Sequence, residues 1–250
     1  MPPSRQHHVA KTDRYEIHLA DSRDVLDQMP SRSVDLILTD PPYNLGLYSR
    51  GNISLSWRKE INNDLAAWDT VTFDPAHWAD DFLRILKPTG NLFAFTSYNL
   101  LGRWHQVFDP LFDTFQFMVW HKTNPVPKVR KAGFVNSCEL IVCMWQKGHT
   151  WNFTRQKEMH NFIETPICMG KERTRNPVHP TQKPLKVLEH VVDLASHPGD
   201  MVFDPFMGVG STGVAAMNRN RRFWGAENEA SYFRAAEQRL RTASEPGESA

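Results

Sequence analysis

The sequence predicts a single α/β domain, in which a mostly parallel sheet is covered by helices on both faces. Along the sequence, segments in which apolar and polar residues alternate as in a strand are followed by segments with helical spacing, which is typical of such a fold. The run 34–39 is almost continuously apolar, as expected for a strand that is buried on both faces. With 250 residues, the chain is long enough for one large domain.

The sequence itself delimits the elements of the N-terminal half. Apolar and polar residues alternate over 15–19, which predicts a strand. A short helix over 24–29 ends before Pro30, because proline has no backbone N–H to donate. Asp74 and Pro75 are a suitable N-cap and first-turn residue for a longer helix. The other elements of this half are a strand, that helix, a strand and a helix at 34–39, 74–86, 91–96 and 100–108.

The C-terminal half alternates in the same way. An amphipathic helix is predicted over 184–196, and the strand at 201–203 leads into a glycine-rich turn. The last strand ends at Glu227. The remaining strands are expected at 115–120, 139–145 and 222–226, and the remaining helices at 212–218 and 230–242.

Four segments lack a periodic pattern. Residues 1–14 are expected to be a flexible N-terminus, and residues 243–250 a disordered tail. Residues 44–72 are rich in Asn, Ser, Gly and Trp and predict a long, mobile loop, which at that length is usually functional or disordered. Residues 149–178 are polar and irregular. The folded domain is therefore expected to span 15–242.

The charge pattern is more informative than the total charge. A formal net charge of +1 and a pI of about 7.8 do not indicate a strongly basic nucleic-acid-binding domain. Segments 121–131 and 171–175 are nevertheless locally basic, and such patches can hold phosphates on a nearly neutral protein. A solvated surface face is the alternative interpretation of both.

Several protein classes are disfavoured. No apolar run approaches the length of a membrane span, and residues 1–20 lack the apolar core of a signal peptide, so a cytoplasmic protein is expected. The three cysteines include no CxxC pair, which disfavours a disulfide framework or a zinc ribbon. The eleven histidines show no HExxH spacing, and no metal site is predicted.

The tetrapeptide Asp40-Pro41-Pro42-Tyr43 follows the apolar strand and is the first candidate site. Neither proline has a backbone N–H, so the turn presents mainly acceptors: the Asp40 carboxylate and the Pro41 carbonyl. Two acceptors match the two N–H bonds of an exocyclic amine and favour the positive charge that develops when its nitrogen attacks. Tyr43 offers a stacking face for an extruded base. The alternative is an ordinary turn after a strand.

A second candidate site follows the strand at 201–203. Gly208 and Gly210 allow close approach of a ligand to the backbone, and the next helix offers N–H groups to an anion. Glu227 ends the following strand, where a carboxylate can accept two ribose hydroxyls. Val214 occupies the position where a P-loop needs lysine. Because parallel strands end at one edge of a sheet, both sites are expected side by side.

These motifs resemble the S-adenosylmethionine-dependent DNA amino-methyltransferases of bacteria. TDPPYNLG at 39–46 is similar to their catalytic motif, and DPFMGVGSTG at 204–213 to their methionine-binding motif. HPTQKP at 179–184 is similar to the segment beside the cofactor. The catalytic motif comes first, which is the permuted, beta-type order. Residues 119–148 resemble the cell-cycle adenine methyltransferases typified by the GANTC enzyme of Caulobacter.

The resemblance implies a Rossmann-like domain with a seven-stranded sheet whose last strands form a hairpin. It implies catalytic roles for Asp40, Pro41, Pro42 and Tyr43. It implies S-adenosyl-L-methionine as cofactor, bound by Asp21, Asp204, Pro205, Phe206, Gly208, Gly210, Ser211, Thr212, Glu227, Asn228, His179, Thr181, Gln182 and Lys183. Together with the basic segments it implies contacts to double-stranded DNA from Trp120, Lys122, Lys128, Arg130, Lys131, Arg173 and Arg175.

Two departures bear on DNA recognition. The segment 149–178, where the family places target-recognition residues, is short, and the C-terminal extension of the Caulobacter-type enzyme is absent. A second subunit could supply the missing contacts, so a homodimer is a candidate assembly. A cognate restriction endonuclease is a candidate partner.

Three other functions compete with adenine-N6 methylation. Cytosine-N4 methylation uses the same acceptor turn, and Asp40 together with the segment 119–148 favours adenine over it. A catalytically inactive nucleic-acid-binding module on the same fold is disfavoured by the intact motifs. A nicotinamide dehydrogenase would need an N-terminal dinucleotide fingerprint, which the sequence lacks. The lack of a cysteine near Asp40 disfavours covalent attack on a pyrimidine ring carbon.

Overall fold

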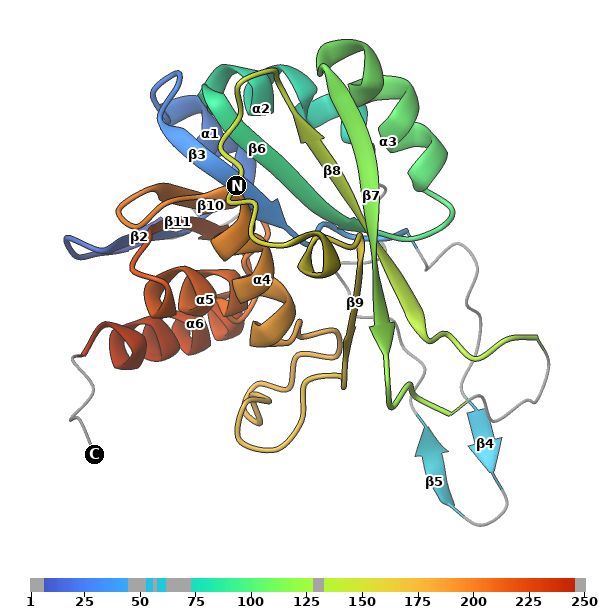
Figure 1. Cartoon of the computed structure of the whole chain (residues 1–250). Coiled ribbons are helices and arrows are strands. Elements are labelled where there is room, and N and C mark those ends of the chain that lie inside the picture. Colours follow the sequence, from blue (N-terminus) through green and yellow to red (C-terminus); the bar gives the residue numbers. More distant parts are fainter. Residues whose placement is uncertain (1–6, 45–52, 56–57, 62–72, 128–132, 246–250) are drawn as a thin grey trace.

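Nine strands form one sheet in the computed structural model, which describes residues 7–44, 53–55, 58–61, 73–127 and 133–245. Their order is β1-β2-β11-β10-β3-β6-β8-β7-β9 (Figure 1). The strands are β1 (His8–Lys11), β2 (Tyr15–Leu19), β3 (Val34–Thr39), β6 (Leu86–Thr96), β7 (Thr114–Lys122), β8 (Cys138–Trp145), β9 (Phe162–Thr165), β10 (Met201–Asp204) and β11 (Arg222–Glu227). A separate hairpin consists of β4 (Ile53–Leu55) and β5 (Arg58–Ile61).

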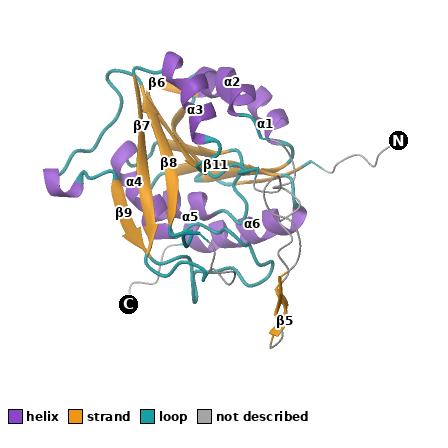
Figure 2. Ribbon diagram, turned by 90° about the vertical axis from the view of Figure 1, so that its right-hand side faces the viewer, coloured by secondary structure: helices purple, strands orange, loops and turns teal. Residues whose placement is uncertain are grey.

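Helices cover both faces of the large sheet (Figures 1 and 2). One face carries α1 (Ser22–Gln28), α2 (Ala79–Ile85) and α3 (Leu101–Phe108). The other carries α4 (Leu185–Ala195), α5 (Ser211–Asn218) and α6 (Ala230–Ser244). Short 3-10 turns are η3 (Pro75–Trp78), η4 (Asp109–Leu111) and η5 (Gln156–Glu158). The predicted α/β class is confirmed.

The position of β3 explains why its sequence is almost continuously apolar. Every residue of β3 is buried, and alternate side chains enter opposite cores. Leu36 and Leu38 pack in the core under α4 to α6, whereas Ile37 packs in the core under α1 to α3. The strand therefore lies at the centre of the molecule, and its carboxyl end is held in place from both sides.

The sheet differs from the seven-stranded expectation by two edge strands. β1 pairs antiparallel with β2, although residues 1–14 were expected to be flexible. β9 pairs parallel with β7 inside the segment 149–178, which was expected to be irregular. Both strands have four residues, too few for a clear alternation pattern, and the neighbouring strand's free edge determines their conformation. The hairpin that the resemblance implies is β7 with β8, whereas the last two strands, β10 and β11, run parallel.

Several expected boundaries also move. Strand β6 begins at Leu86, directly after α2, rather than at 91, and residues 87–90 lie in an irregularity of the strand, where the register with β3 shifts between the pairs Val34–Leu86 and Leu36–Asn91. Helix α6 extends to Ser244, two residues into the predicted tail, and residues 246–250 lie outside the described part. Of the predicted loop 44–72, the structure describes Asn44 and the β4–β5 hairpin.

The ends of that loop are joined by side-chain hydrogen bonds. Asn44 accepts from the backbone N–H of Phe73 at 2.7 Å and donates to the carbonyl of Phe73 at 2.8 Å. Asn44 is buried, so this pair fixes the chain at both ends of the segment. Among the described residues, no helix is long and apolar enough to cross a membrane.

Candidate active site

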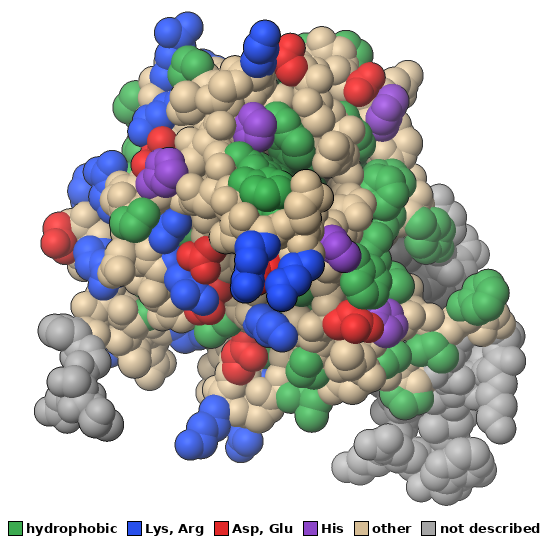
Figure 3. Space-filling view, viewed as in Figure 1, with side chains coloured by type: hydrophobic (Ala, Val, Ile, Leu, Met, Phe, Trp, Pro, Cys, Tyr) green, Lys and Arg blue, Asp and Glu red, His purple; other side chains and the backbone are tan. Residues whose placement is uncertain are grey.

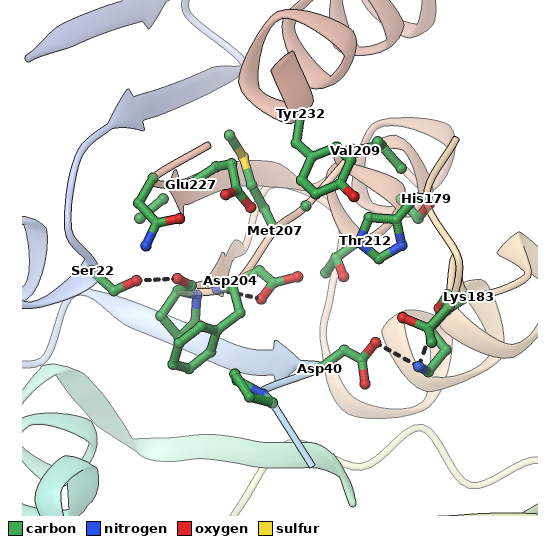
Figure 4. Close-up of a pocket in the computed structure, with 18 of the residues that line it drawn as sticks. Ser22, Asp40, His179, Lys183, Asp204, Met207, Val209, Thr212, Glu227 and Tyr232 are labelled. Atoms are coloured by element: carbon green, nitrogen blue, oxygen red, sulfur yellow. Dashed lines mark hydrogen bonds and ion pairs between the residues drawn. The ribbon is translucent and has the colours of Figure 1, made fainter. Parts of the chain in front are cut away.

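A cavity lies at the carboxyl edge of the parallel strands, where β3, β10 and β11 end (Figure 4). Its volume is about 240 Å³. Both predicted sites contribute to it: Asp40 and Pro42 from the first, and the turn after β10 from the second. The expectation that the two turns lie side by side is confirmed by this shared cavity.

Asp40 is the polar centre of the first turn. The Tyr43 hydroxyl donates to Asp40 Oδ1 at 2.6 Å, and the Lys183 ammonium contacts Asp40 Oδ2. Pro41 is buried, and Pro42 faces the cavity. The Tyr43 carbonyl accepts from Asn99 Nδ2 at 3.1 Å, which ties the turn to the loop after β6. The turn is thus held by its neighbours and retains a carboxylate at the cavity wall.

Lys183 and Glu139 surround Asp40 with buried charge. The Lys183 side chain is 5% exposed, and its Nζ lies 3.3 Å from Glu139 Oε2. The other Glu139 oxygen pairs with Lys122 at 2.7 Å. Lys183 was predicted in the cofactor set; it lines the same cavity, but its ammonium is directed to Asp40 (Figure 4). Glu139 was not predicted as a site residue, although it lies in the segment 119–148 that resembles the cell-cycle adenine methyltransferases.

Burial and charge act against each other at this cluster. Burial raises the pKa of Asp40 above its usual range, and Lys183 partly offsets that effect. The pKa of Lys183 is raised, because two carboxylates outweigh the burial that would lower it. The pKa of Glu139 is lowered by its two lysines despite its burial. Lys183 therefore helps to keep the Asp40 carboxylate ionised in a buried place.

Asp204 joins the two turns. Its Oδ1 accepts from the Thr39 hydroxyl at 2.8 Å and from the Phe206 N–H at 3.0 Å. Burial raises the pKa of Asp204 to about 6. The contact fixes the distance between the end of β3 and the turn after β10, and the Ser22 hydroxyl donates to the Pro205 carbonyl in the same turn.

The glycines of the second turn have different reasons to be glycine. Gly208 has φ of +53° and lines the cavity, where an added Cβ would lie 3.0 Å from His179 Nε2. Gly210 has φ of +76°, and an added Cβ would lie 2.9 Å from the Ala236 Cβ on α6. Gly208 therefore leaves room for the His179 ring at the cavity wall, whereas Gly210 allows α6 to pack. The first residues of α5, Ser211 and Thr212, also line the cavity.

A carboxylate lies at the far end of the cavity. Glu227 accepts from the Glu229 N–H at 2.8 Å, and burial raises its pKa to about 7. Asn228 lies next to it, and Asp21, which caps α1, lies on the same wall. These predicted residues are brought together as expected.

An aromatic wall completes this end of the cavity and was only partly predicted. Phe206 and Trp78 pack edge to face with ring centres 4.8 Å apart. Trp78 is held from outside by the Arg23 guanidinium, 4.1 Å from its ring centre. Met207 and Tyr232 also line the cavity. Trp78 comes from η3, whose sequence shows helical spacing but no sign of a ligand contact.

The segment 179–183 separates the main cavity from a second one of about 220 Å³. His179, Thr181 and Gln182 line both cavities. Gln182 is buried and bonded to the backbone of Glu172 and Thr174, so the segment is held rigidly. His179 packs against Tyr232, and burial lowers the pKa of the imidazole to about 4.

The predicted DNA contacts fall in three environments. Trp120 is 2% exposed and donates to the Thr165 hydroxyl at 2.9 Å, so it forms part of the wall of the second cavity. Lys122 and Arg173 line that cavity as well, and Arg175 is exposed. Lys128, Arg130 and Lys131 lie outside the described residues. Basic and acidic side chains are intermixed on the face shown in Figure 3.

The joined turns match a known family. The family model of N6/N4 DNA methylases aligns with residues 34–238. The chain belongs to this family. The type II methyltransferase M2.DpnII of Streptococcus pneumoniae is 31% identical to this DNA methylase over 244 residues, 90% of this chain and 89% of M2.DpnII. The type II methyltransferase M.HinfI of Haemophilus influenzae is 32% identical over 236 residues; these cover 86% of this chain but 65% of M.HinfI.

Solved structures agree with this assignment. The complex of M1.HpyAVI with S-adenosylmethionine has a TM-score of 0.64 and 26% identity to this DNA methylase, covering 90% of this chain and all of that chain. The cytosine-N4-specific PvuII methyltransferase has a TM-score of 0.65 at 17% identity, covering 94% of this chain and 92% of its own. That likeness concerns the fold alone.

Proposed function

We propose that this DNA methylase transfers a methyl group from S-adenosyl-L-methionine to the N6 amino group of an adenine in double-stranded DNA. The observation that carries the proposal is the shared cavity: the Asp40 carboxylate and the glycine turn after β10 face the same space and are linked through Thr39 and Asp204. An amine held at one end is thereby brought next to a nucleoside cofactor held at the other.

The residues that line the cavity suit the chemistry of the cofactor. Gly208 lines the cavity with a positive φ and no side chain, which suits a ligand in close contact with the backbone. Glu227 can accept hydrogen bonds from ribose hydroxyls, and the wall of Trp78 and Phe206 suits an aromatic base. When bound, S-adenosylmethionine supplies an electrophilic methyl group on a positively charged sulfur.

Asp40 and the Pro41 carbonyl would act on the amine. Each can accept one N–H, which orients the nitrogen lone pair toward the methyl carbon. As the N–C bond forms and the S–C bond breaks, the nitrogen becomes positively charged, and the Asp40 carboxylate stabilises it. Asp40 can then receive the proton that the methylated amine loses. The base must leave the duplex stack to reach this position.

The choice of base is tested by nucleoside analysis. Adenine is favoured by Asp40 and by the resemblance of residues 119–148 to cell-cycle adenine methyltransferases. Plasmid DNA treated with the protein and cofactor should contain N6-methyladenine on mass analysis. Finding N4-methylcytosine alone would replace adenine by cytosine, and finding neither, with cofactor bound, would contradict the proposal. Sequencing of the methylated DNA at single-base resolution would give the recognised site.

The basic segment supplies the proposed DNA contacts. Lys128, Arg130 and Lys131 follow β7, and Lys122 and Arg173 line the second cavity. Replacing Lys128, Arg130 and Lys131 together by Ser should weaken DNA binding and flatten its salt dependence, because fewer counterions are released. An unchanged salt slope would place the contacts elsewhere.

The proposed assembly is a homodimer, in which a second copy supplies DNA contacts beyond the short segment 149–178. Light scattering of the active protein tests it: a fully active monomer would contradict the dimer. A cognate restriction endonuclease is the proposed partner in the cell, supported by the similarity to two proteins named type II methyltransferases.

A further inference from the structure

Glu139 is a second carboxylate beside the reactive end of β3. It lies on β8, is 17% exposed, and its two oxygens face different lysines. Its Oε2 lies 3.3 Å from the Lys183 ammonium and 3.3 Å from the Tyr43 hydroxyl. Glu139 lies outside the motifs at 39–46 and 204–213, and the proposed reaction assigns it no role.

The Lys183 ammonium creates a conflict that Glu139 resolves. Its contact with Asp40 keeps that carboxylate ionised, but its positive charge also opposes the charge that develops on the amine nitrogen. Asp40 and Lys183 alone would have no net charge. Glu139 Oε2 lies 3.3 Å from the ammonium and offsets its positive charge on the side near Asp40, while Lys122 pairs with the other Glu139 oxygen and makes the four groups neutral together.

The Tyr43 hydroxyl gives a second reason to assign Glu139 a part in the site. It has one proton, which it donates to Asp40 Oδ1 at 2.6 Å, while Glu139 Oε2 lies 3.3 Å away. An amine that approaches Asp40 competes with this hydroxyl for the carboxylate. A small rotation of the hydroxyl toward Glu139 releases Asp40 without leaving a buried donor unsatisfied.

We propose that Glu139 is a positioning residue for methyl transfer, which balances the charge of Lys183 and accepts the Tyr43 hydroxyl when the amine binds Asp40. The inference rests on the proposed function, since it assigns Glu139 a part in the same site. It concerns the amine and holds for adenine and cytosine alike. The charged or titratable groups around Asp40 are Lys183, Glu139, Tyr43, Asp204, Lys122 beyond Glu139, and His179 beside Lys183.

The test compares Glu139→Gln with Lys183→Met. The pKa of Asp40 is measured by carbon-13 NMR titration of labelled aspartate carboxyls, assigned with Asp40→Asn. Removing the negative charge of Glu139 should lower this pKa, and removing the positive charge of Lys183 should raise it, each by about 1 unit. The double variant should lie between the two. Because this readout needs no turnover, it separates failure of the inference from failure of the proposed function.

Kinetics at saturating cofactor complete the test. Glu139→Gln should lower kcat about 10-fold to 100-fold and leave KM for DNA and the Kd of the cofactor within about twofold. The acid limb of its kcat profile should move to lower pH, and that of Lys183→Met to higher pH. Lys183→Arg keeps the positive charge and should leave the acid limb of the kcat profile at its wild-type pH. This variant provides a second comparison if Lys183→Met does not fold.

Lys87→Met is the matched control, because it breaks an Asp–Lys pair at the opposite end of β3. This variant should change neither the pKa of Asp40 nor the pH of the acid limb of the kcat profile. The inference is overturned if the two principal variants shift the pKa in the same direction or not at all. It is also overturned if Glu139→Gln retains the kcat of an active wild-type protein.

Discussion

The two ends of β3 each carry an aspartate–lysine pair, and the pairs are built in opposite ways. At the amino end, Asp35 is 11% exposed and Lys87 36% exposed, with an Nζ–Oδ distance of 2.8 Å. At the carboxyl end, Lys183 is 5% exposed and Asp40 20% exposed. In the first pair the lysine is the more exposed partner, whereas in the second pair the carboxylate is the more exposed partner. The first pair ties strands together, because Asp35 also accepts from the Met201 N–H at 2.9 Å, whereas the second holds an acid open to a cavity.

The largest expected difference follows from removing each aspartate. Asp40→Ala should lower the rate of methyl transfer about 100-fold to 1000-fold, since the developing charge loses its stabilising carboxylate, and cofactor binding should stay nearly normal. Asp35→Ala should instead lower the free energy of unfolding by about 1–3 kcal/mol and keep the rate within about threefold. Single-turnover rates and urea titrations measure both. Near-normal turnover of Asp40→Ala would remove Asp40 from the reaction.

The next effect concerns the carboxyl end of β11. Glu227→Gln should weaken cofactor binding about 10-fold to 100-fold in calorimetry, because hydrogen bonds to a charged acceptor are lost. Glu229→Gln is the matched control: Glu229 accepts from the Ser231 N–H and caps α6. Equal losses in both variants would indicate a general distortion of α6 rather than a cofactor contact.

The stability of the ligand-free protein should depend on pH through the same residue. The folded-state pKa of Glu227, about 7, lies above its ordinary value of 4.5, so the folded state binds more protons between these values. Stability should therefore fall as pH rises from about 4.5 to 7, by up to about 3 kcal/mol from this group. His179, with its pKa lowered to about 4, acts in the opposite direction. The stabilities of wild type and Glu227→Gln should differ little in their pH dependence below about pH 4.5 and diverge between pH 4.5 and 7, because only wild type has a buried carboxylate to ionise. Parallel pH dependences across this range would contradict the assignment.

The smallest effect is expected for Lys87→Met. Lys87 is partly exposed, so its pair with Asp35 contributes about 1 kcal/mol or less. A slightly lower Tm with unchanged methyl transfer would support a purely structural role. A loss of activity would mean that the two ends of β3 are coupled.

The sequence predicted the elements whose patterns are local. The buried run of β3 and the turns that follow β3 and β10 were recognisable from their own residues. β1 and β9 were not, because four-residue edge strands take their conformation from a neighbour that the local sequence does not reveal. Residues 87–90 contain proline and glycine and lie inside β6 as an irregularity, because Val34 pairs with Leu86 and Leu36 with Asn91; the pairing of Leu86 before this irregularity could not be predicted from the local sequence.

The motifs located the site, but not its charge network. Lys183 was assigned to the cofactor by its motif, whereas its ammonium contacts Asp40, 143 residues earlier in the chain. Glu139 lies 96 residues after Tyr43, in a strand for which no site residue was predicted. Such contacts depend on how β8 and the segment before α4 meet the end of β3, and no local pattern encodes that arrangement.

The pairing of β3 with β10 has a consequence for folding during translation. Val202 pairs with Leu36, and Phe203 with Ile37, although most of the chain lies between them. During translation, β3 and the turn that contains Asp40 leave the ribosome early, and the neighbouring strand β10 follows only near the end. Long-range parallel pairing of this kind slows folding. A prematurely terminated polypeptide that lacks β10 therefore has no complete catalytic centre.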